Sequence, residues 1–257
     1  MNQQTGMQLE HDGQGLYTLT MGDAGKACVV TQDSALAMTQ ALRQVREAPD
    51  ARVLVLRSAG KSFNAGGDIS AISATLADSD RLLGAIIDAF HESILALRRL
   101  PVPVIGSVHG AAAGGGFSLA LACDLLVVGR SARFVTAYPA LGTSSDGGLS
   151  HTLTRRLGAM KALEIVLGGP LGAAEAQALG LVAKLVEDAQ LEAETLAYAR
   201  QIAQMAPQSV RAFKQLVGAA EDAELEAQLA RESAAFLGCA RTEDFRNRVQ
   251  AFLQKRG

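Results

Sequence analysis

Apolar and polar residues along the first part of the chain follow two different periods. Residues 16–20 alternate as in a half-buried strand, and a polar turn follows them. Residues 33–47 repeat apolar side chains at the three- and four-residue spacing of an amphipathic helix, which Asp33 would cap. The pattern therefore predicts a strand followed by a helix.

The middle of the chain repeats this order with more deeply buried strands. Residues 53–56, 102–108 and 125–128 are apolar runs of strand length, and a segment of helix length, residues 81–100, separates the first two. Alternation of strands and helices is typical of a sheet that is parallel at least in part and joined by right-handed crossovers. We therefore expect an α/β fold.

Beyond Gly158 the pattern becomes helical. Six segments between Lys161 and Lys255 are rich in Ala, Leu, Glu and Gln and have helix-like spacing. No internal repeat or low-complexity tract interrupts them. This change of character predicts a helical C-terminal region of about 95 residues, a common size for a structural unit.

Two glycine-rich turns follow predicted strands. Gly114, Gly115 and Gly116 stand between the apolar run 102–108 and a helix-compatible segment, and residues 63–68, FNAGGD, follow the run 53–56. Glycine lets a ligand approach the backbone, and the start of a helix adds unpaired N–H donors and partial positive charge. Two donors from the two turns are therefore expected to meet on one carbonyl oxygen. The alternative is that the glycines only make tight turns.

Composition and charge exclude several classes of protein. The 257 residues, 49% hydrophobic and 19% charged, suffice for a large core. The net charge is −2 and the Lys and Arg residues are scattered, which argues against nucleic acid as a partner. The longest apolar stretch, residues 111–123, is too short to cross a bilayer, and residues 1–15 lack the features of a secretory signal. We therefore expect a cytoplasmic protein that does not enter membranes.

The cysteines and histidines indicate no metal site. Cys28, Cys123 and Cys239 are far apart, with no CxxC pair, and the four histidines have no metal-ligand spacing. His91 lies in the predicted helix 81–100, where the apolar period around it favours a structural role.

Four ordered motifs resemble those of a known family. FNAGGDI at residues 63–69 resembles the FxAGxDI turn of the crotonase, or enoyl-CoA hydratase/isomerase, superfamily. PVIGSVHG at 103–110, followed by AGGG at 113–116 and ALACD at 120–124, resembles its second hallmark. ALGLV at 178–182 and AFLQKR at 251–256 resemble its C-terminal part. The resemblance covers nearly the whole chain.

The resemblance implies a fold and a ligand. The fold is a crotonase-like ββα spiral core, here residues 1–195, with a C-terminal helical trimerisation region, residues 196–257. The ligand is an acyl-CoA thioester, so coenzyme A is part of the substrate and no separate cofactor is expected. The oligomer would be a homotrimer or a dimer of trimers.

The resemblance also assigns site residues by position. Gly67 and Gly115 would donate their backbone N–H groups to the thioester oxygen. Their neighbours in the two turns would contact the substrate; these are Ala65, Asp68, Ile69 and Gly114.

Three further residues would bind the CoA moiety. Lys26 stands near where the family carries basic residues, although the usual Arg-Pro pair is absent. Phe252 and Lys255 match an aromatic residue and a lysine that meet the adenine end from a neighbouring subunit.

The sequence departs from the hydratases at both of their glutamates. Ser118 and Tyr138 occupy those positions, so each is expected to line the acyl pocket and not to transfer a proton. Asp146 remains, at the position where an isomerase branch of the family, notably phenylacetyl-CoA epoxide isomerases, carries a functional aspartate. A single carboxylate suits a 1,3-proton shift, because the group that removes the proton can return it.

Three alternatives stay open at this point. Asp146 is also suited to capping a helix that starts near Gly147. A hydratase could use Asp146 with water, and a protein that only binds acyl-CoA would need no base.

Overall fold

The computed structural model describes residues 6–74, 79–222 and 224–254 of the chain. Its strands are β1 (Met7–His11), β2 (Leu16–Met21), β3 (Val53–Ser58), β4 (Val104–Val108), β5 (Ala111–Ala113), β6 (Leu125–Gly129), β7 (Arg133–Val135), β8 (Leu171–Gly172) and β9 (Lys184–Val186). Its α-helices are α1 (Gln32–Glu47), α2 (Ile69–Ala74), α3 (Gly84–Arg98), α4 (Gly115–Ala122), α5 (Tyr138–Leu141), α6 (Leu149–Leu157), α7 (Ala159–Gly168), α8 (Ala173–Ala178), α9 (Leu191–Ala203), α10 (Pro207–Asp222), α11 (Leu225–Ala240) and α12 (Glu243–Gln254).

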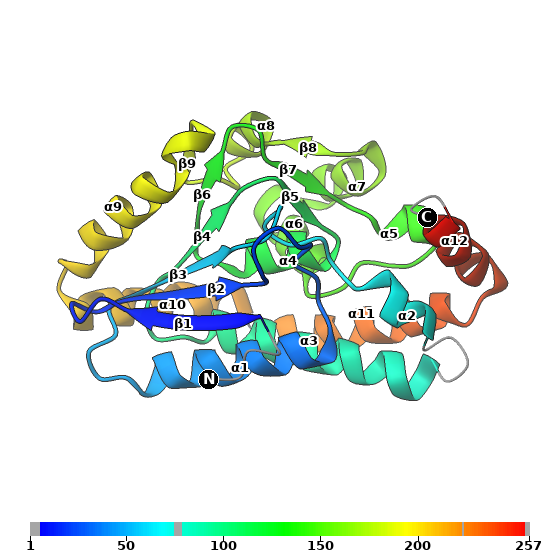
Figure 1. Ribbon diagram of the computed structural model, residues 1–257, viewed down its shortest axis with the longest axis horizontal. Helices are drawn as coiled ribbons and strands as arrows, with labels where there is room; N and C mark the ends of the chain where they lie inside the picture. The colour runs from blue at the N-terminus through cyan, green and yellow to red at the C-terminus, as the bar shows by residue number, and fades with distance from the viewer. Residues whose placement is uncertain (1–5, 75–78, 223, 255–257) are drawn as a thin grey trace.

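A six-stranded sheet forms the centre of the fold (Figure 1). Its order is β1-β2-β3-β4-β6-β9; β1 is antiparallel to β2, and all other neighbours are parallel. In a smaller sheet, β7 pairs with β5 in parallel and with β8 antiparallel. The predicted α/β fold is confirmed. Strand β1 was not predicted, because most of its side chains are polar and exposed.

The central sheet is covered on both faces. Val53 and Val55 of β3 are buried with Leu191 and Ala199 of α9. The alternate residues Leu54 and Leu56 belong to the larger core, which also includes residues of α1 and α3. Successive strand residues point to opposite faces, so this alternation explains why an unbroken apolar run forms β3.

Helix α1 begins differently from the expectation. Thr31 is its N-cap: the Thr31 hydroxyl accepts a hydrogen bond from the Ser34 N–H at 3.1 Å, and the Ser34 hydroxyl accepts one from the Thr31 N–H at 2.9 Å. This reciprocal pair satisfies two backbone donors at once, which leaves Asp33 inside the first turn.

The C-terminal helices lie along the core (Figure 1). The boundary expected between residues 195 and 196 falls inside α9, which packs as a whole against β3, β4 and β6. After it, α11 packs against α3, and α12 packs against α2 and α5. The last two helices therefore reach the side of the core where the glycine turns lie.

Candidate active site

A pocket of about 390 Å³ opens where the two glycine turns meet. Its walls combine the backbone of both turns with apolar side chains; these are Val30, Ile69, Ile72, Leu83, Ile86, Ile87, Phe90, Ala137, Ala140, Leu141, Phe236, Ala251 and Phe252. The titratable side chains among the described lining residues are Tyr138, Asp146 and Arg248. Asp146 is thus the one carboxylate in the described wall of a largely apolar pocket.

Gly67 and Gly115 both line the pocket and offer free donors. The Val30 N–H binds the Gly66 carbonyl at 2.7 Å and the Asp68 N–H binds the Val30 carbonyl at 3.1 Å, a bridge that bypasses the Gly67 N–H. Gly115 is the first residue of α4, where an N–H has no acceptor within the helix. No acceptor in the described part of the chain bonds to either N–H. An oxygen in the pocket can therefore accept from both.

Close backbone packing explains the glycines around these donors. A Cβ at Gly116 would lie 2.2 Å from the Asn64 carbonyl oxygen. A Cβ at Gly66, where φ is +83°, would lie 2.6 Å from the Ala113 carbonyl oxygen. Since the Ala113 N–H also binds the Asn64 carbonyl at 2.9 Å, the two turns are fixed against each other. The glycines make tight turns and also present the donors.

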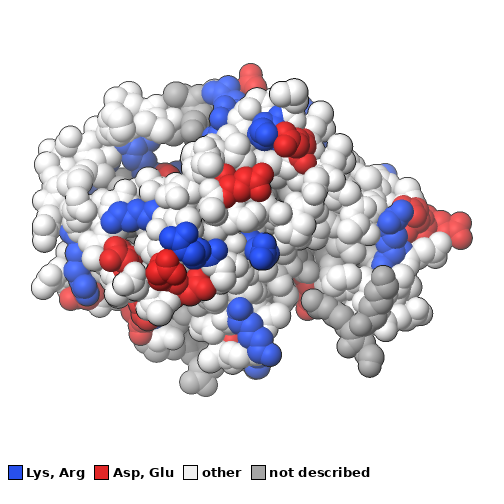
Figure 2. Space-filling model, turned by 90° about the horizontal axis from the view of Figure 1, so that it is seen from above, with Lys and Arg blue, Asp and Glu red and all other residues white. Residues whose placement is uncertain are grey.

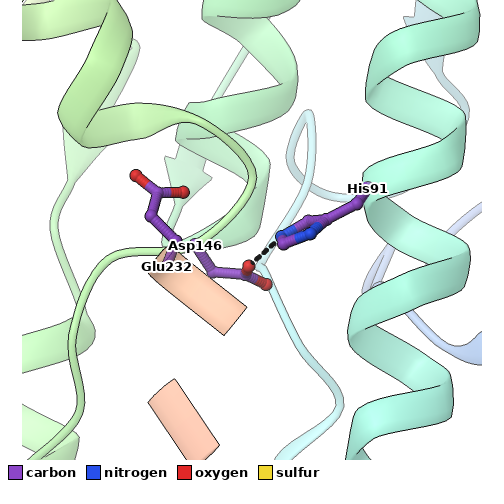
Figure 3. Close-up of side chains that lie close together, drawn as sticks. All are labelled: His91, Asp146 and Glu232. Carbon is purple, nitrogen blue, oxygen red and sulfur yellow. Dashed lines mark hydrogen bonds and ion pairs between the residues drawn. The ribbon is translucent and has the colours of Figure 1, made fainter. Parts of the chain in front are cut away.

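Asp146 is hydrogen-bonded to a histidine from another element (Figure 3). His91 Nε2 of α3 lies 2.5 Å from Asp146 Oδ1, and each residue is only 8% exposed. His91 is not among the residues that line the pocket, whereas Asp146 is. Asp146 therefore reaches the pocket wall, whereas its partner His91 does not.

The charges near His91 favour an imidazolium. Burial by itself lowers the pKa of His91, but the hydrogen bond and Coulombic attraction of Asp146, with contributions from Glu232 and Asp88, raise it above its ordinary value. A protonated His91 holds Asp146 in one orientation through a charge-assisted hydrogen bond.

Ser118 and Tyr138 hold the backbone of Asp146. The Ser118 hydroxyl donates to the Asp146 carbonyl at 2.6 Å, the Tyr138 hydroxyl donates to the same oxygen at 3.1 Å, and the two hydroxyls lie 3.1 Å apart. Burial, together with the charge of Asp146, raises the pKa of Tyr138 well above its ordinary value, so this hydroxyl stays neutral. Tyr138 lines the pocket, but Ser118 does not.

We expect the two hydroxyls to substitute for each other in part. Ser118→Ala and Tyr138→Phe should each lower the free energy of unfolding by about 1 kcal/mol. The double variant should lose more than the sum, because the buried Asp146 carbonyl then keeps only the long 3.5 Å bond from the Leu149 N–H. Urea unfolding of the three variants measures this, and strictly additive losses would contradict it.

The helix that follows Asp146 is not capped by it. Helix α6 begins at Leu149 with Gly148 as its N-cap residue, and the Asp146 side chain bonds to His91 instead. The carboxylate of Glu232, from α11, accepts from the Gly148 N–H at 2.6 Å and from the Ser150 N–H at 3.1 Å. The capping alternative for Asp146 is therefore wrong, because a distant glutamate takes that role.

His91, Asp146 and Glu232 form a compact buried cluster (Figure 3). One potential ligand atom from each lies within 4.8 Å of the others, although their sequence spacing gave no sign of this. The His91 and Asp146 atoms share a hydrogen bond, and both Glu232 oxygens accept from donors of residues 145–150. The contacts are those of a hydrogen-bonded His–Asp pair beside a carboxylate held by other donors.

A model of the enoyl-CoA hydratase/isomerase family matches residues 12–257. The chain belongs to this family. It is 32% identical to the 1,2-epoxyphenylacetyl-CoA isomerase of Escherichia coli strain K12 over 250 residues. This alignment covers 96% of this chain and 95% of that protein. The chain is 30% identical over 254 residues to a short-chain-enoyl-CoA hydratase of Clostridium acetobutylicum, and that alignment covers 94% of this chain and 96% of the hydratase.

Solved structures confirm the crotonase fold. The crystal structure of an enoyl-CoA hydratase/isomerase from Mycobacterium paratuberculosis superposes with a TM-score of 0.88 at 28% identity, covering 96% of this chain and 98% of that one. The similarity therefore extends over both the core and the C-terminal helices. Among the described helices, none combines the length and hydropathy that a bilayer crossing demands.

The other residues expected to contact the substrate do not all line the pocket. Ala65, Ile69 and Gly114 line the pocket. Asp68 is not among the lining residues. Its carboxylate accepts hydrogen bonds from the N–H groups of Ser70 at 2.9 Å and Ala71 at 3.2 Å, at the start of α2.

The three residues expected to bind the CoA moiety lie in different places. Lys26 is exposed and paired with Asp23 at 3.0 Å, outside the pocket lining. Phe252 lies on the pocket of its own chain, whereas the family pattern assigns it to a neighbouring subunit's site. Lys255 lies outside the described residues. On the face shown in Figure 2, Lys and Arg are interspersed with Asp and Glu, as their scatter in the sequence predicts.

Two residues at the site were missed or misjudged from the sequence. The apolar period favoured a structural role for His91, and the structure shows the residue buried, but this period carries no information about its partner, which lies 55 residues away. Glu232 was not singled out, because a glutamate on a helix rich in Glu and Gln has no distinguishing pattern. Its burial, 4% exposed, became visible only in the packed structure.

Proposed function

We propose that this family member shifts a double bond in an unsaturated acyl-CoA, with Asp146 as the proton carrier. One observation carries this proposal: a single carboxylate shares the described wall of an apolar pocket with two free backbone donors, Gly67 N–H and Gly115 N–H. The reaction needs one acid–base group and one oxyanion site.

The residues act in two steps. Asp146 removes a proton from C2 of a 3-enoyl thioester, and the C–H electron pair becomes part of a dienolate whose negative charge reaches the thioester oxygen. The N–H groups of Gly67 and Gly115 stabilise this oxygen. Asp146 then returns the proton to C4, and the double bond lies between C2 and C3. Coenzyme A enters only as part of the thioester.

The surroundings of Asp146 support isomerisation over hydration. Adding water requires one group to activate the water and a proton donor for the carbon. Ser118 and Tyr138, at the positions of the two hydratase glutamates, both donate to the Asp146 carbonyl and stay neutral. The names of the two relatives differ on this point, one an isomerase and the other a hydratase, so the preference rests on these contacts.

A panel of 2-enoyl-, 3-enoyl- and ring-containing acyl-CoAs in deuterated water tests the proposal by mass spectrometry. Isomerisation yields a positional isomer that liquid chromatography separates from the substrate, with the mass of the substrate plus any deuterium exchanged at Asp146. A product heavier by one molecule of heavy water would instead establish a hydratase, the alternative in which Asp146 acts with water. Binding without any conversion across the panel would establish an acyl-CoA-binding protein and overturn the proposal.

Two apolar helix faces suit self-association, and we propose that they form the contact in a trimer or a dimer of trimers. Met160, Leu163 and Leu167 are exposed at helical spacing on α7, and Phe213 and Leu216 are exposed on α10. Two different faces that meet between copies form a head-to-tail contact, which closes into a trimeric ring where each copy is rotated by one third of a turn. Large exposed apolar faces are rare on monomers.

We expect Leu163→Lys to shift the assembly toward monomer, because a charge would enter the apolar contact. Sedimentation velocity measures the mass. The control is Leu36→Lys, the same change at an isolated exposed leucine of α1, which should leave the mass unchanged. A wild-type chain that sediments as a monomer would contradict the prediction.

A further inference from the structure

Glu232 is a buried carboxylate that the proton transfer does not use. It lies on α11, is 4% exposed and is not among the residues that line the pocket. Its oxygens accept from the hydroxyls of Ser145 at 3.1 Å and Ser150 at 2.5 Å, and from the N–H groups of Gly148 at 2.6 Å and Ser150 at 3.1 Å. These donors lie on both sides of Asp146 in the sequence.

A carboxylate buried to this extent requires such partners. Burial raises the pKa of Glu232, while the bonds from Ser150 and Gly148 oppose that rise. The N–H groups of Gly148 and Ser150 are donors that α6 itself cannot satisfy, and a negative charge is favoured at a helix start. One turn earlier on α11, Gln228 also donates to the Ser150 hydroxyl, at 2.7 Å. Two side chains of α11, Glu232 and Gln228, therefore form hydrogen bonds with residues 145–150.

The segment that carries Asp146 is therefore held from two sides. The Ser118 and Tyr138 hydroxyls hold the Asp146 carbonyl, and Glu232 holds the residues before and after it. Small displacements of a group that takes a proton from substrate are costly, because the transfer requires hydrogen-bond distance and alignment.

We propose that Glu232 is a positioning residue for Asp146, through which the C-terminal helix α11 fixes the carboxylate between His91 and the pocket. The proposal rests on the proposed function in that Asp146 is the proton carrier. It gives α11 a part in building the active site of its own chain. Glu232 itself touches neither the substrate nor the pocket.

The test compares Glu232→Gln with Glu226→Gln. Glutamine keeps the shape of Glu232, but its NH₂ group meets N–H and O–H donors where an oxygen accepted them. We expect a fall in kcat of about 10- to 100-fold with KM within about twofold, because geometry is lost and binding is not. Glu226, on the same helix, is exposed and pairs with Arg99, so its variant should keep the wild-type rate.

A second readout does not depend on turnover. In the ligand-free protein, NMR titration of the His91 imidazole, assigned with His91→Gln, should show its pKa lowered in Glu232→Gln. The acidic groups that raise this pKa are Asp146, Glu232 and Asp88, so loss of one charge and a looser Asp146 act in the same direction. Because loss of the Glu232 charge lowers this pKa by itself, positioning is judged from Ser150→Ala, which removes one donor to Glu232 and keeps the charge. A displaced Asp146 should lower the His91 pKa there too, whereas a role in stability alone would lower Tm and leave the Ser150→Ala titration unchanged.

The outcomes separate the two proposals. Wild-type kcat and an unchanged His91 titration in folded Glu232→Gln would overturn the positioning role. If that variant does not fold, Ser150→Ala, which removes one donor and keeps the carboxylate, is judged by the same two measurements. If the wild type performs no isomerisation, the proposed function fails, and the His91 titration in Ser150→Ala, where the Glu232 charge is kept, decides alone whether the Glu232 contacts fix Asp146 beside His91.

Discussion

Asp146→Asn is expected to lower the isomerisation rate by at least about 10³-fold, within the range for loss of a general acid–base group. Affinity for acyl-CoA should stay within about tenfold, because a proton carrier contributes to the transition state more than to ground-state binding. Asparagine has nearly the same shape and still offers an oxygen to His91, so the segment should keep its position. The measurements are the rate of conversion of a 3-enoyl-CoA to the 2-enoyl-CoA, followed by liquid chromatography, and the Kd for a product acyl-CoA.

Asp124→Asn is the matched control for that change. The Asp124 carboxylate accepts from Lys214 at 2.6 Å and from the Val104 N–H at 2.7 Å, and it is not among the residues that line the pocket. The same substitution there should leave the rate per folded molecule unchanged. An Asp146→Asn enzyme with near wild-type turnover would remove this carboxylate from the mechanism.

Gly115→Pro should lower the rate by about 10²- to 10³-fold, the cost of one oxyanion donor. Proline lacks the N–H, yet it is compatible with the first residue of a helix, which is the place of Gly115 in α4. Gly115→Ala keeps the donor, and its Cβ would meet Phe90 at an ordinary 3.4 Å, so it should retain most of the activity.

The comparison of these two variants separates the donor from the space around it. Equal losses in proline and alanine variants would indicate that the pocket shape, and not the N–H, limits the rate. Circular dichroism and Tm serve as the check that α4 still forms in both.

Local patterns were sufficient for much of the fold. The apolar run 53–56 is a property of neighbouring residues, so it predicted β3 correctly, and the glycine turns indicated where backbone N–H groups are exposed to a ligand. The family pattern added the place of Asp146, because motif order fixes positions that no local period defines. Ser118 and Tyr138 were placed beside the site in this way, although their bonds to the Asp146 carbonyl were not foreseen.

The remaining features depend on contacts between distant segments. His91 and Asp146 meet only because α3 packs beside the loop before α6, and Glu232 replaces Asp146 as the capping group only because α11 crosses the same loop. A side chain such as Asp146 has two locally reasonable roles, cap or base. The hydrogen-bond partner of the Asp146 side chain, His91, and the carboxylate that binds the start of α6, Glu232, lie 55 and 84 residues from their partners, so no local pattern contains them.

The bonds from Glu232 to residues 145–150 span 82 to 87 positions of the chain. Contacts of such separation form late in folding, because closing a long loop costs entropy before any contact compensates for it. During synthesis from the N-terminus, the central sheet and both glycine turns are made before α11 exists. We therefore expect a nascent chain to acquire its backbone donors before Asp146 is fixed, so that the proposed activity would appear only once α11 has packed.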